Sequence, residues 1–142
     1  MRWLFLLLLV AAHAVRADTL SGRVVAVQDG DTLTLMDASR QRHKIRLADI
    51  AAPEPGQPFY LRSSKSLASI CFRKPASATT QGKDRHGHHL GKVKCNDVDA
   101  SAEQVRRGFA WTAKEYVPMT SALYELEAYA RLRQLGVWSQ AK

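Results

Sequence analysis

Little in this sequence supports a membrane-spanning or repetitive architecture. After residue 12 there is no apolar run long enough to cross a bilayer. Internal repeats and low-complexity tracts are also absent, and 142 residues leave room for one domain. The two cysteines do not form a Cys-x-x-Cys pair, which argues against a metal site built from cysteines.

Acidic residues are scarce relative to basic ones. The chain has 13 Asp and Glu against 21 Lys and Arg, which gives a formal net charge of +8. This balance favours a polyanionic partner, such as nucleic acid, a phosphate-rich surface or an anionic membrane. Charge alone does not choose among these partners, and an ordinary solvated surface is the alternative. Hydrophobic residues make up 46% of the chain, which is enough for a core.

Residues 1–17 are typical of a secretory signal peptide. Arg2 supplies a positive charge, residues 3–12 are apolar, and small residues precede a cleavage site after Ala17. We therefore expect an exported domain over residues 18–142, periplasmic or secreted, with no stable membrane association after signal removal. An N-terminal membrane anchor is the alternative, although the apolar run is short for a span.

The cysteines fit an exported protein. Cys71 and Cys95 both lie beyond the expected cleavage site, and an oxidising compartment favours a disulfide between them. Two buried thiols are the alternative. A bond would connect the end of a helix to the end of a strand, and closing that loop stabilises a fold by about 3 kcal/mol in the chain-entropy model.

Hydrophobic periodicity and turn signals predict a small α+β fold. Five strands are expected at residues 20–27, 33–36, 42–50, 76–80 and 88–95. Three helices are expected at residues 59–72, 99–107 and 121–135. Five strands with a helix after the third are the outline of an OB-type barrel.

The first three strands bring chemically useful side chains to turns and strand ends. Asp29-Gly30 is a turn pair between the first two strands, and Asp31 follows it. The third strand carries Arg46 and Asp49 and ends near Glu54. Carboxylates that hold a divalent cation and orient water, beside an arginine that neutralises growing phosphate charge, suit attack on a phosphodiester.

Motifs along most of the chain resemble the staphylococcal-nuclease-like (thermonuclease) family. The clearest are Asp-Gly-Asp-Thr at 29–32 and Arg-Leu-x-x-Ile-x-Ala-Pro-Glu at 46–54. Counterparts of three further family segments follow in order, at residues 84–88, 105–111 and 123–138. The resemblance implies a five-stranded OB-type barrel with about three helices, and a calcium-dependent phosphodiesterase that cleaves DNA and RNA.

The resemblance assigns roles to particular residues. Asp31 matches the first calcium-binding aspartate, and Ala52 supplies the backbone carbonyl of the calcium site. Arg46 matches the first catalytic arginine, and Glu54 matches the glutamate that acts on the attacking water. Calcium is therefore the expected cofactor, with another divalent metal as the alternative.

Two catalytic positions depart from the family pattern. The second calcium-binding aspartate falls on Ala51, and the second arginine falls on His88. On an extended strand Asp49 would face the same side as residue 51 and replace the missing ligand, the alternative being a surface aspartate. Histidine lacks the planar fork of arginine, so a weakened enzyme is expected. Three histidines could instead hold zinc, the alternative being solvated loop residues: His86, His88 and His89.

Sequence-independent contacts to nucleic acid are expected from basic and aromatic side chains around the same cleft. The candidates are Lys83, Arg85, His86 and Tyr116. Two hypotheses follow. The first is an exported, monomeric nuclease with an altered metal site, and the second is a catalytically silent module that binds nucleic acid or a protein.

Overall fold

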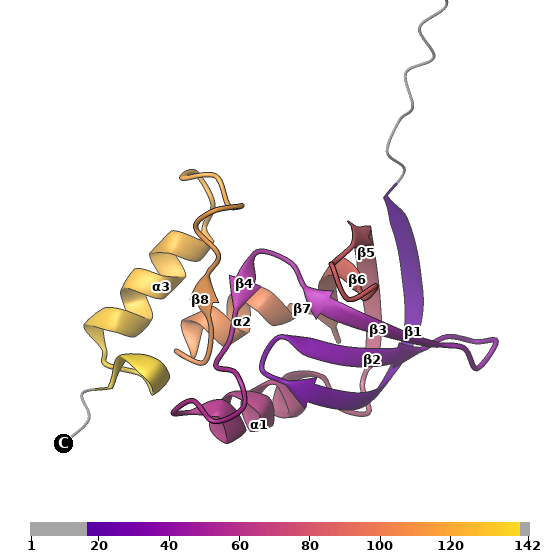
Figure 1. Cartoon of the computed structure of the whole chain (residues 1–142), viewed down its shortest axis with the longest axis horizontal. Coiled ribbons are helices and arrows are strands. Elements are labelled where there is room, and N and C mark those ends of the chain that lie inside the picture. Colours follow the sequence, from indigo (N-terminus) through magenta and orange to yellow (C-terminus); the bar gives the residue numbers. More distant parts are fainter. Residues whose placement is uncertain (1–16, 140–142) are drawn as a thin grey trace, which may run out of the picture.

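Five strands close into a barrel in the computed structural model, which describes residues 17–139 (Figure 1). They are β1 (Asp18–Asp29), β2 (Thr32–Met36), β3 (Arg42–Leu47), β5 (Pro75–Lys83) and β6 (His89–Cys95). Their order in the sheet is β3-β2-β1-β5-β6, and a parallel pairing of β3 with β6 joins the two ends. The expected OB-type barrel is therefore confirmed.

Alternating apolar residues build the barrel interior. Leu33 and Leu35 on β2, Ile45 and Leu47 on β3, and Val93 on β6 are at most 1% exposed. Their neighbours along each strand point outward, because successive side chains of a strand face opposite sides. The pairing of Asp29 with Thr32 confirms the tight turn expected at Asp29-Gly30.

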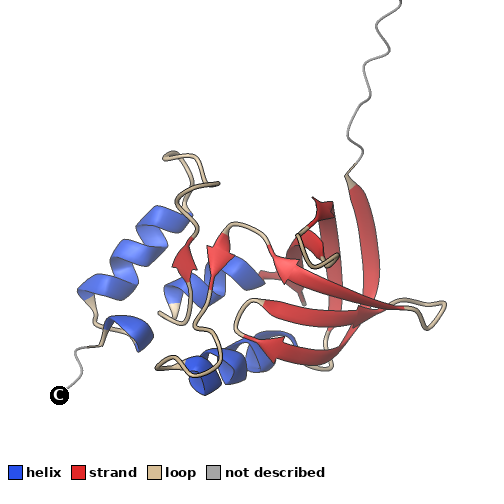
Figure 2. Cartoon of the chain, in the orientation of Figure 1, coloured by secondary structure: helices blue, strands red, loops and turns tan. Residues whose placement is uncertain are grey.

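Three helices pack outside the barrel, as the sequence predicts. α1 (Tyr60–Cys71) lies beneath the barrel in Figure 1, whereas α3 (Leu123–Leu132) lies far from it, beyond α2 (Ala100–Arg106). The short 3₁₀ helix η1 (Gly136–Trp138) follows α3. Figure 2 shows the strands gathered at one side of the molecule and the helices along the other side and below.

A disulfide ties α1 to the barrel. Cys71 is the last residue of α1 and Cys95 the last residue of β6, and the two are bonded with their Cα atoms 5.2 Å apart. Ser63, Leu67 and Ile70 share the buried face of α1, at helical spacing. The expected bond between a helix end and a strand end is thus confirmed.

Some predicted boundaries are wrong. The strand expected to run from 42 to 50 ends at Leu47, because Asp49 adopts a left-handed backbone with a φ of 70°. The chain then resumes as β4 (Ile50–Ala51), which pairs with β8 (Trp111–Thr112) instead of a barrel strand. The third helix is also shorter than expected, since Gln134 has a φ of 54°.

Three two-residue strands were not predicted, since so short an element carries no periodic signal. They are β4, β8 and β7 (Val98–Asp99), which pairs with the end of β6. Residues 1–16 of the expected signal peptide lie outside the described part of the chain. Over residues 17–139, no helix has the length and apolar character needed to cross a bilayer.

Candidate active site

Asp31 lies in the turn between β1 and β2, and the chain folds around its carboxylate. Its backbone N–H donates to Oδ1 of Asp29, 3.1 Å away. Its own Oδ1 accepts from the Thr32 hydroxyl at 2.9 Å, and its Oδ2 accepts from the Ala52 N–H at 3.2 Å. These contacts fix the orientation of a side chain that is only 13% exposed.

The electrostatic setting of Asp31 favours a nearby cation. Burial, helped by the hydrogen bond and negative charge of Asp29, raises the pKa of the Asp31 carboxyl to about 7. The positive charge of Arg46 and the Thr32 hydroxyl act in the opposite direction. Burial removes the water that would otherwise solvate the ionised carboxylate. A nearby positive charge compensates for this loss and stabilises the ionised form.

Arg46 supplies a positive charge beside Asp31. It projects from β3, and its Nη2 lies 3.7 Å from Oδ2 of Asp31. The pairing of Thr32 with Arg46 between β2 and β3 holds the two residues in register. The Arg46 side chain is 41% exposed, so part of its five-donor fork faces solvent. The structure therefore brings together the first two residues predicted for the site.

Asp49 does not lie as the sequence led us to expect. The strand ends before it, so the alternation argument that placed it on the same side as residue 51 does not hold. Its Oδ2 lies 3.7 Å from Nζ of Lys92 on β6, which already balances its charge. Ala52 is buried and directs its N–H to Asp31, whereas Ala51 pairs with Trp111.

Glu54 lies on an exposed turn after Pro53. Its N–H donates to Oε1 of Gln57 at 2.9 Å, and its carbonyl accepts from the Gln57 N–H at the same distance. Its carboxylate forms no ion pair with any residue between 17 and 139. Glu54 is therefore accessible to solvent and to a substrate.

The loop between β5 and β6 is organised by Asp84. Its Oδ1 accepts from the N–H groups of His86 and His88, both at 2.9 Å, and its Oδ2 lies 3.4 Å from Nδ1 of His88. The neighbouring Lys83 and Arg85 are exposed. Because β3 pairs with β6 from Ile45 onward, this loop lies beside the strand that carries Arg46.

The histidines of this loop do not form the zinc site considered from the sequence. His86 and His88 have ring centroids 6.1 Å apart, while His89 lies beside His43, 5.9 Å away. In the described part of the chain, no three His, Cys, Asp or Glu side chains are grouped closely enough to hold a metal ion. His86 and His88 therefore form one pair, and His89 forms another with His43.

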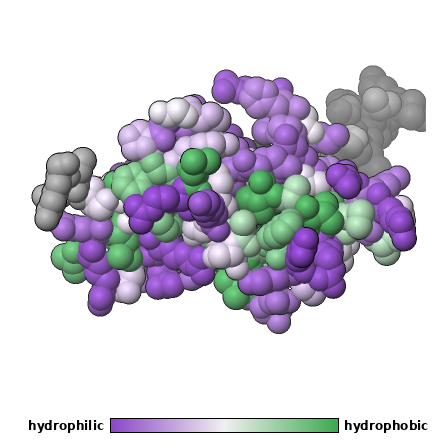
Figure 3. Space-filling model, turned by 90° about the horizontal axis from the view of Figure 1, so that it is seen from below, coloured by the Kyte–Doolittle hydropathy of each residue, from purple (hydrophilic) through white to green (hydrophobic). Residues whose placement is uncertain are grey.

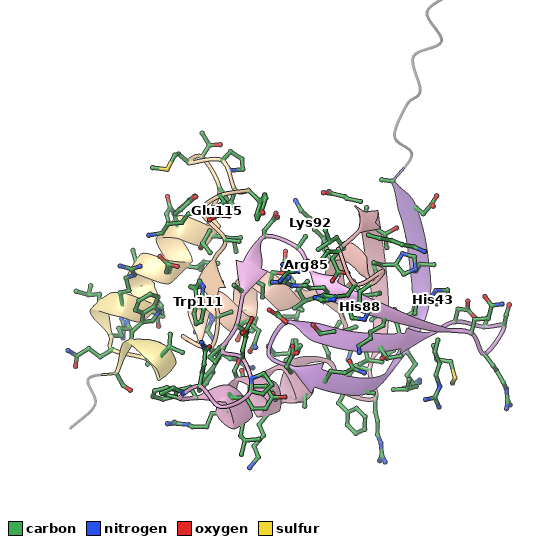
Figure 4. The ribbon with its side chains drawn as sticks, viewed as in Figure 1. His43, Arg85, His88, Lys92, Trp111 and Glu115 are labelled. Atoms are coloured by element: carbon green, nitrogen blue, oxygen red, sulfur yellow. A yellow bond between two sulfur atoms is a disulfide. The ribbon has the colours of Figure 1, made fainter. Side chains whose placement is uncertain are left out.

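A pocket of about 450 Å³ opens beside Arg46. Ala51 and Trp111 line it from the paired strands β4 and β8, and Tyr116 lines it from the loop before α3. Figure 4 shows Trp111 and Glu115 on the β8 side of the molecule, and Arg85, His88 and Lys92 on the barrel side. Tyr116 is 80% exposed, so its ring is free to contact a ligand. Of the predicted nucleic-acid contacts, Tyr116 therefore shares the pocket with Arg46.

Sequence reasoning missed two buried side chains, Gln104 and Ser63, which form hydrogen bonds behind the turn that carries Asp31. Nε2 of Gln104, on α2, donates to the Gly30 carbonyl at 2.8 Å and to the Ser63 carbonyl at 3.2 Å. The Ser63 hydroxyl in turn donates to the Phe109 carbonyl at 2.6 Å. Gln104 follows Ala100 and Ser101 at helical spacing on the buried face of α2, and a buried glutamine needs partners, but the local pattern does not name those partners.

Comparison with known proteins agrees with this arrangement. A family model described as "Staphylococcal nuclease homologue" matches residues 44–140. The chain is 38% identical to a micrococcal nuclease of Shigella flexneri over 128 residues, which cover 83% of this chain and 73% of that protein. The chain belongs to the staphylococcal nuclease family. It is also 35% identical to an uncharacterized endonuclease of Escherichia coli O157:H7, over 99% of this chain and 91% of the relative.

Nucleases of this family depend on a metal ion, and the resemblance implies two aspartates and a carbonyl as ligands of calcium. Asp31 and Ala52 are adjacent here, but the resemblance places the second aspartate at Ala51, which has no carboxylate. One carboxylate supplies few of the six to eight oxygens that calcium prefers. The residues of this chain therefore do not fit a calcium ion held in the family manner.

Proposed function

We propose that this protein is a nuclease-type phosphodiesterase that hydrolyses DNA or RNA without sequence preference, at a rate lowered by two substitutions. The observation that carries the proposal is the Asp31–Arg46 pair, whose arginine lines the pocket. A half-exposed guanidinium beside a fixed carboxylate binds a phosphate while keeping its own orientation. Membership of the staphylococcal nuclease family supports the same reaction class.

Each side chain has a separate role in this proposal. Arg46 binds the scissile phosphate and stabilises the negative charge that grows in the transition state. Glu54, exposed and free of ion pairs among the described residues, accepts the proton of the attacking water. Tyr116 contacts the neighbouring base or sugar across the pocket. Lys83, Arg85 and His86 contact phosphates further along the strand.

Two features lower the expected rate. Ala51 removes a carboxylate, and His88 replaces a second phosphate-binding arginine. His88 is also engaged by the Asp84 carboxylate, which competes with a substrate phosphate for the imidazole ring. Loss of one group that stabilises transition-state charge commonly costs a factor of about 10² or more.

A catalytically silent binding module is the second candidate function. The observation that favours it is the absence, among residues 17–139, of any group of three potential metal ligands. Basic and aromatic side chains around the pocket remain able to bind a nucleic acid strand in that case.

Export to an oxidising compartment is part of the proposal. The Cys71–Cys95 disulfide supports it, because such bonds persist outside the reducing cytosol. β1 begins at Asp18, directly after the expected cleavage site at Ala17, so signal removal would spare the barrel. The mature chain is expected to act as a monomer.

Cleavage of single-stranded DNA by the oxidised protein tests the function. Reactions at low salt contain calcium, manganese or zinc, or a chelator, and run beside Glu54→Gln and Asp31→Asn variants. Metal-dependent cleavage that both variants lose supports the phosphodiesterase. Intact DNA that shifts on a gel supports the binding module, and an absence of both cleavage and binding overturns both candidates.

A further inference from the structure

A second pocket lies between α1 and the end of α2, separate from the one beside Arg46. Its volume is about 320 Å³. Arg62, Lys65 and Ser66 line it from α1, Arg107 lines it from the C-cap of α2, and Phe109 follows in the next segment. Figure 3 views the molecule from below, the side of α1, and shows hydrophilic residues interspersed among apolar ones there. The second pocket is therefore an open site on a mixed surface.

Positive charge around this pocket is not balanced. Glu103 is shared by two arginines, with Arg106 Nη2 at 2.7 Å and Arg107 Nε at 2.9 Å. The Arg106 hydrogen bond is the main reason that the pKa of Glu103 falls to about 2, so this carboxylate stays ionised. Arg62 and Lys65 have no carboxylate partner within residues 17–139. The residues that line the pocket thus include three cationic side chains and no acidic one.

Arg62 is held in place by two aromatic rings. Its guanidinium carbon lies 5.2 Å from the centre of the Phe59 ring and 5.7 Å from that of Phe109. These contacts orient the guanidinium, and because Arg62 is exposed, its N–H groups can reach a ligand. A guanidinium fixed in this way loses little rotamer entropy when it binds the two oxygens of a phosphodiester.

The second pocket is connected to the candidate active site by short segments. Phe109 lines the second pocket and Trp111, two residues later, lines the first. Glu54 and Arg62 are eight residues apart, and helix geometry over the last three limits their Cα separation to about 22 Å. Even at the rise of about 3.4 Å per nucleotide of a duplex strand, about seven nucleotides are enough to reach across this upper limit.

We propose that the pocket of Arg62, Lys65 and Arg107 is a second phosphodiester-binding subsite, which holds the same nucleic acid strand away from the point of cleavage. The inference rests on the proposed function, because it takes the nucleic acid as the ligand. Arg62 and Lys65 bind consecutive phosphates, and Arg107, which is held by Glu103 and Ser69, adds positive charge at the edge of the pocket. The subsite increases affinity for a polynucleotide and leaves the chemical step unchanged.

Binding of a fluorescent 20-nucleotide single strand, in chelator so that cleavage plays no part, tests the subsite. The double variant Arg62→Gln, Lys65→Gln is compared with Arg40→Gln, Arg42→Gln, which removes two equally exposed charges at the β2–β3 turn. We expect the first to weaken binding about tenfold at low salt. Two lost phosphate contacts also reduce the slope of log K against log salt by about 1.4. The control is expected to change affinity by less than about twofold.

Equal losses in both double variants would show that net charge alone matters, and would overturn the subsite. Wild-type affinity in the Arg62, Lys65 variant would overturn it as well. Lost binding to anionic vesicles with unchanged binding to DNA would assign the pocket to a membrane instead. Because Arg62 packs on two rings, thermal unfolding checks the fold, and Lys65→Gln alone must show part of the effect. DNA that is bound but not cleaved overturns the phosphodiesterase while leaving this test intact.

Discussion

The side-chain amide of Gln104 donates to the backbone carbonyl of Gly30, 2.8 Å away and 74 residues earlier in the chain. Gly30 precedes Asp31, so a buried side chain of α2 fixes the turn that presents the candidate catalytic carboxylate. A Cβ atom on Gly30 would lie 1.8 Å from Oγ of Ser63 on α1. The turn is therefore held between two helices, with no space for a larger residue.

Replacement of Gln104 should destabilise the fold. In Gln104→Leu the carbonyls of Gly30 and Ser63 lose their shared donor inside the protein, and an unpaired buried polar group costs about 1–3 kcal/mol. We expect a loss of about 2 kcal/mol in the free energy of unfolding, measured by urea denaturation. Gln28→Leu is the control, because its amide donates to the part-buried Thr34 hydroxyl and should cost less than about 1 kcal/mol. Equal losses in the two variants would contradict the proposed role of Gln104.

Restoration of the two substituted positions should raise nuclease activity. The double variant Ala51→Asp, His88→Arg adds a carboxylate beside Ala52 and a planar fork in the loop beside β3. We expect kcat/KM on single-stranded DNA to rise by about 10² or more in calcium, and to return to its low value in chelator. Each single variant is the control and should give a smaller gain. An unchanged rate in the double variant would mean that the remaining residues are not arranged for catalysis.

Removal of the disulfide should destabilise the protein without changing its site. Cys71 and Cys95 close a loop with a sequence separation of 24, which the chain-entropy model values at about 3 kcal/mol. We expect Cys71→Ala, Cys95→Ala to lose about that much in urea unfolding, while the KM for DNA stays at the wild-type value below the unfolding transition. Reduction of the wild-type protein should reproduce the loss. Full stability after reduction would count against the contribution of the bond.

The ion pairs of Glu103 should make stability depend on pH in the acid range. A carboxylate whose folded pKa is lowered stabilises the fold fully above its ordinary pKa, near 4.5, and the contribution disappears as pH falls towards about 2. We expect Glu103→Gln to cost about 1 kcal/mol at pH 7, since both pairs are partly exposed, and almost nothing at pH 2. Urea unfolding across this range measures the difference. The exposed Glu125→Gln should change stability by less than about 0.5 kcal/mol, and a pH-independent cost at Glu103 would contradict the argument.

Local patterns predicted the barrel because its determinants are local. Alternation in β2 and β3, the Asp29-Gly30 turn and the buried stripe of α1 each follow from a few adjacent residues. The turn at Asp49 did not, because its left-handed φ is imposed by the pairing of β4 with β8, some 60 residues later in the chain. The support of Gly30 by Gln104 was missed for the same reason. Contacts between distant segments determine the turn at Asp49 and the support of Gly30, and local periodicity does not predict such contacts.

The parallel pairing of β3 with β6 has a consequence for when activity can exist. Arg46 belongs to one of these strands, and His88 immediately precedes the other. The segments meet only after loops of more than forty residues have closed, and such distant contacts form slowly. A chain in which β3 and β6 have not yet paired therefore holds Arg46 apart from the loop at residues 84–88. The pairing that closes the barrel is thus also the contact that brings the two segments of the candidate site together.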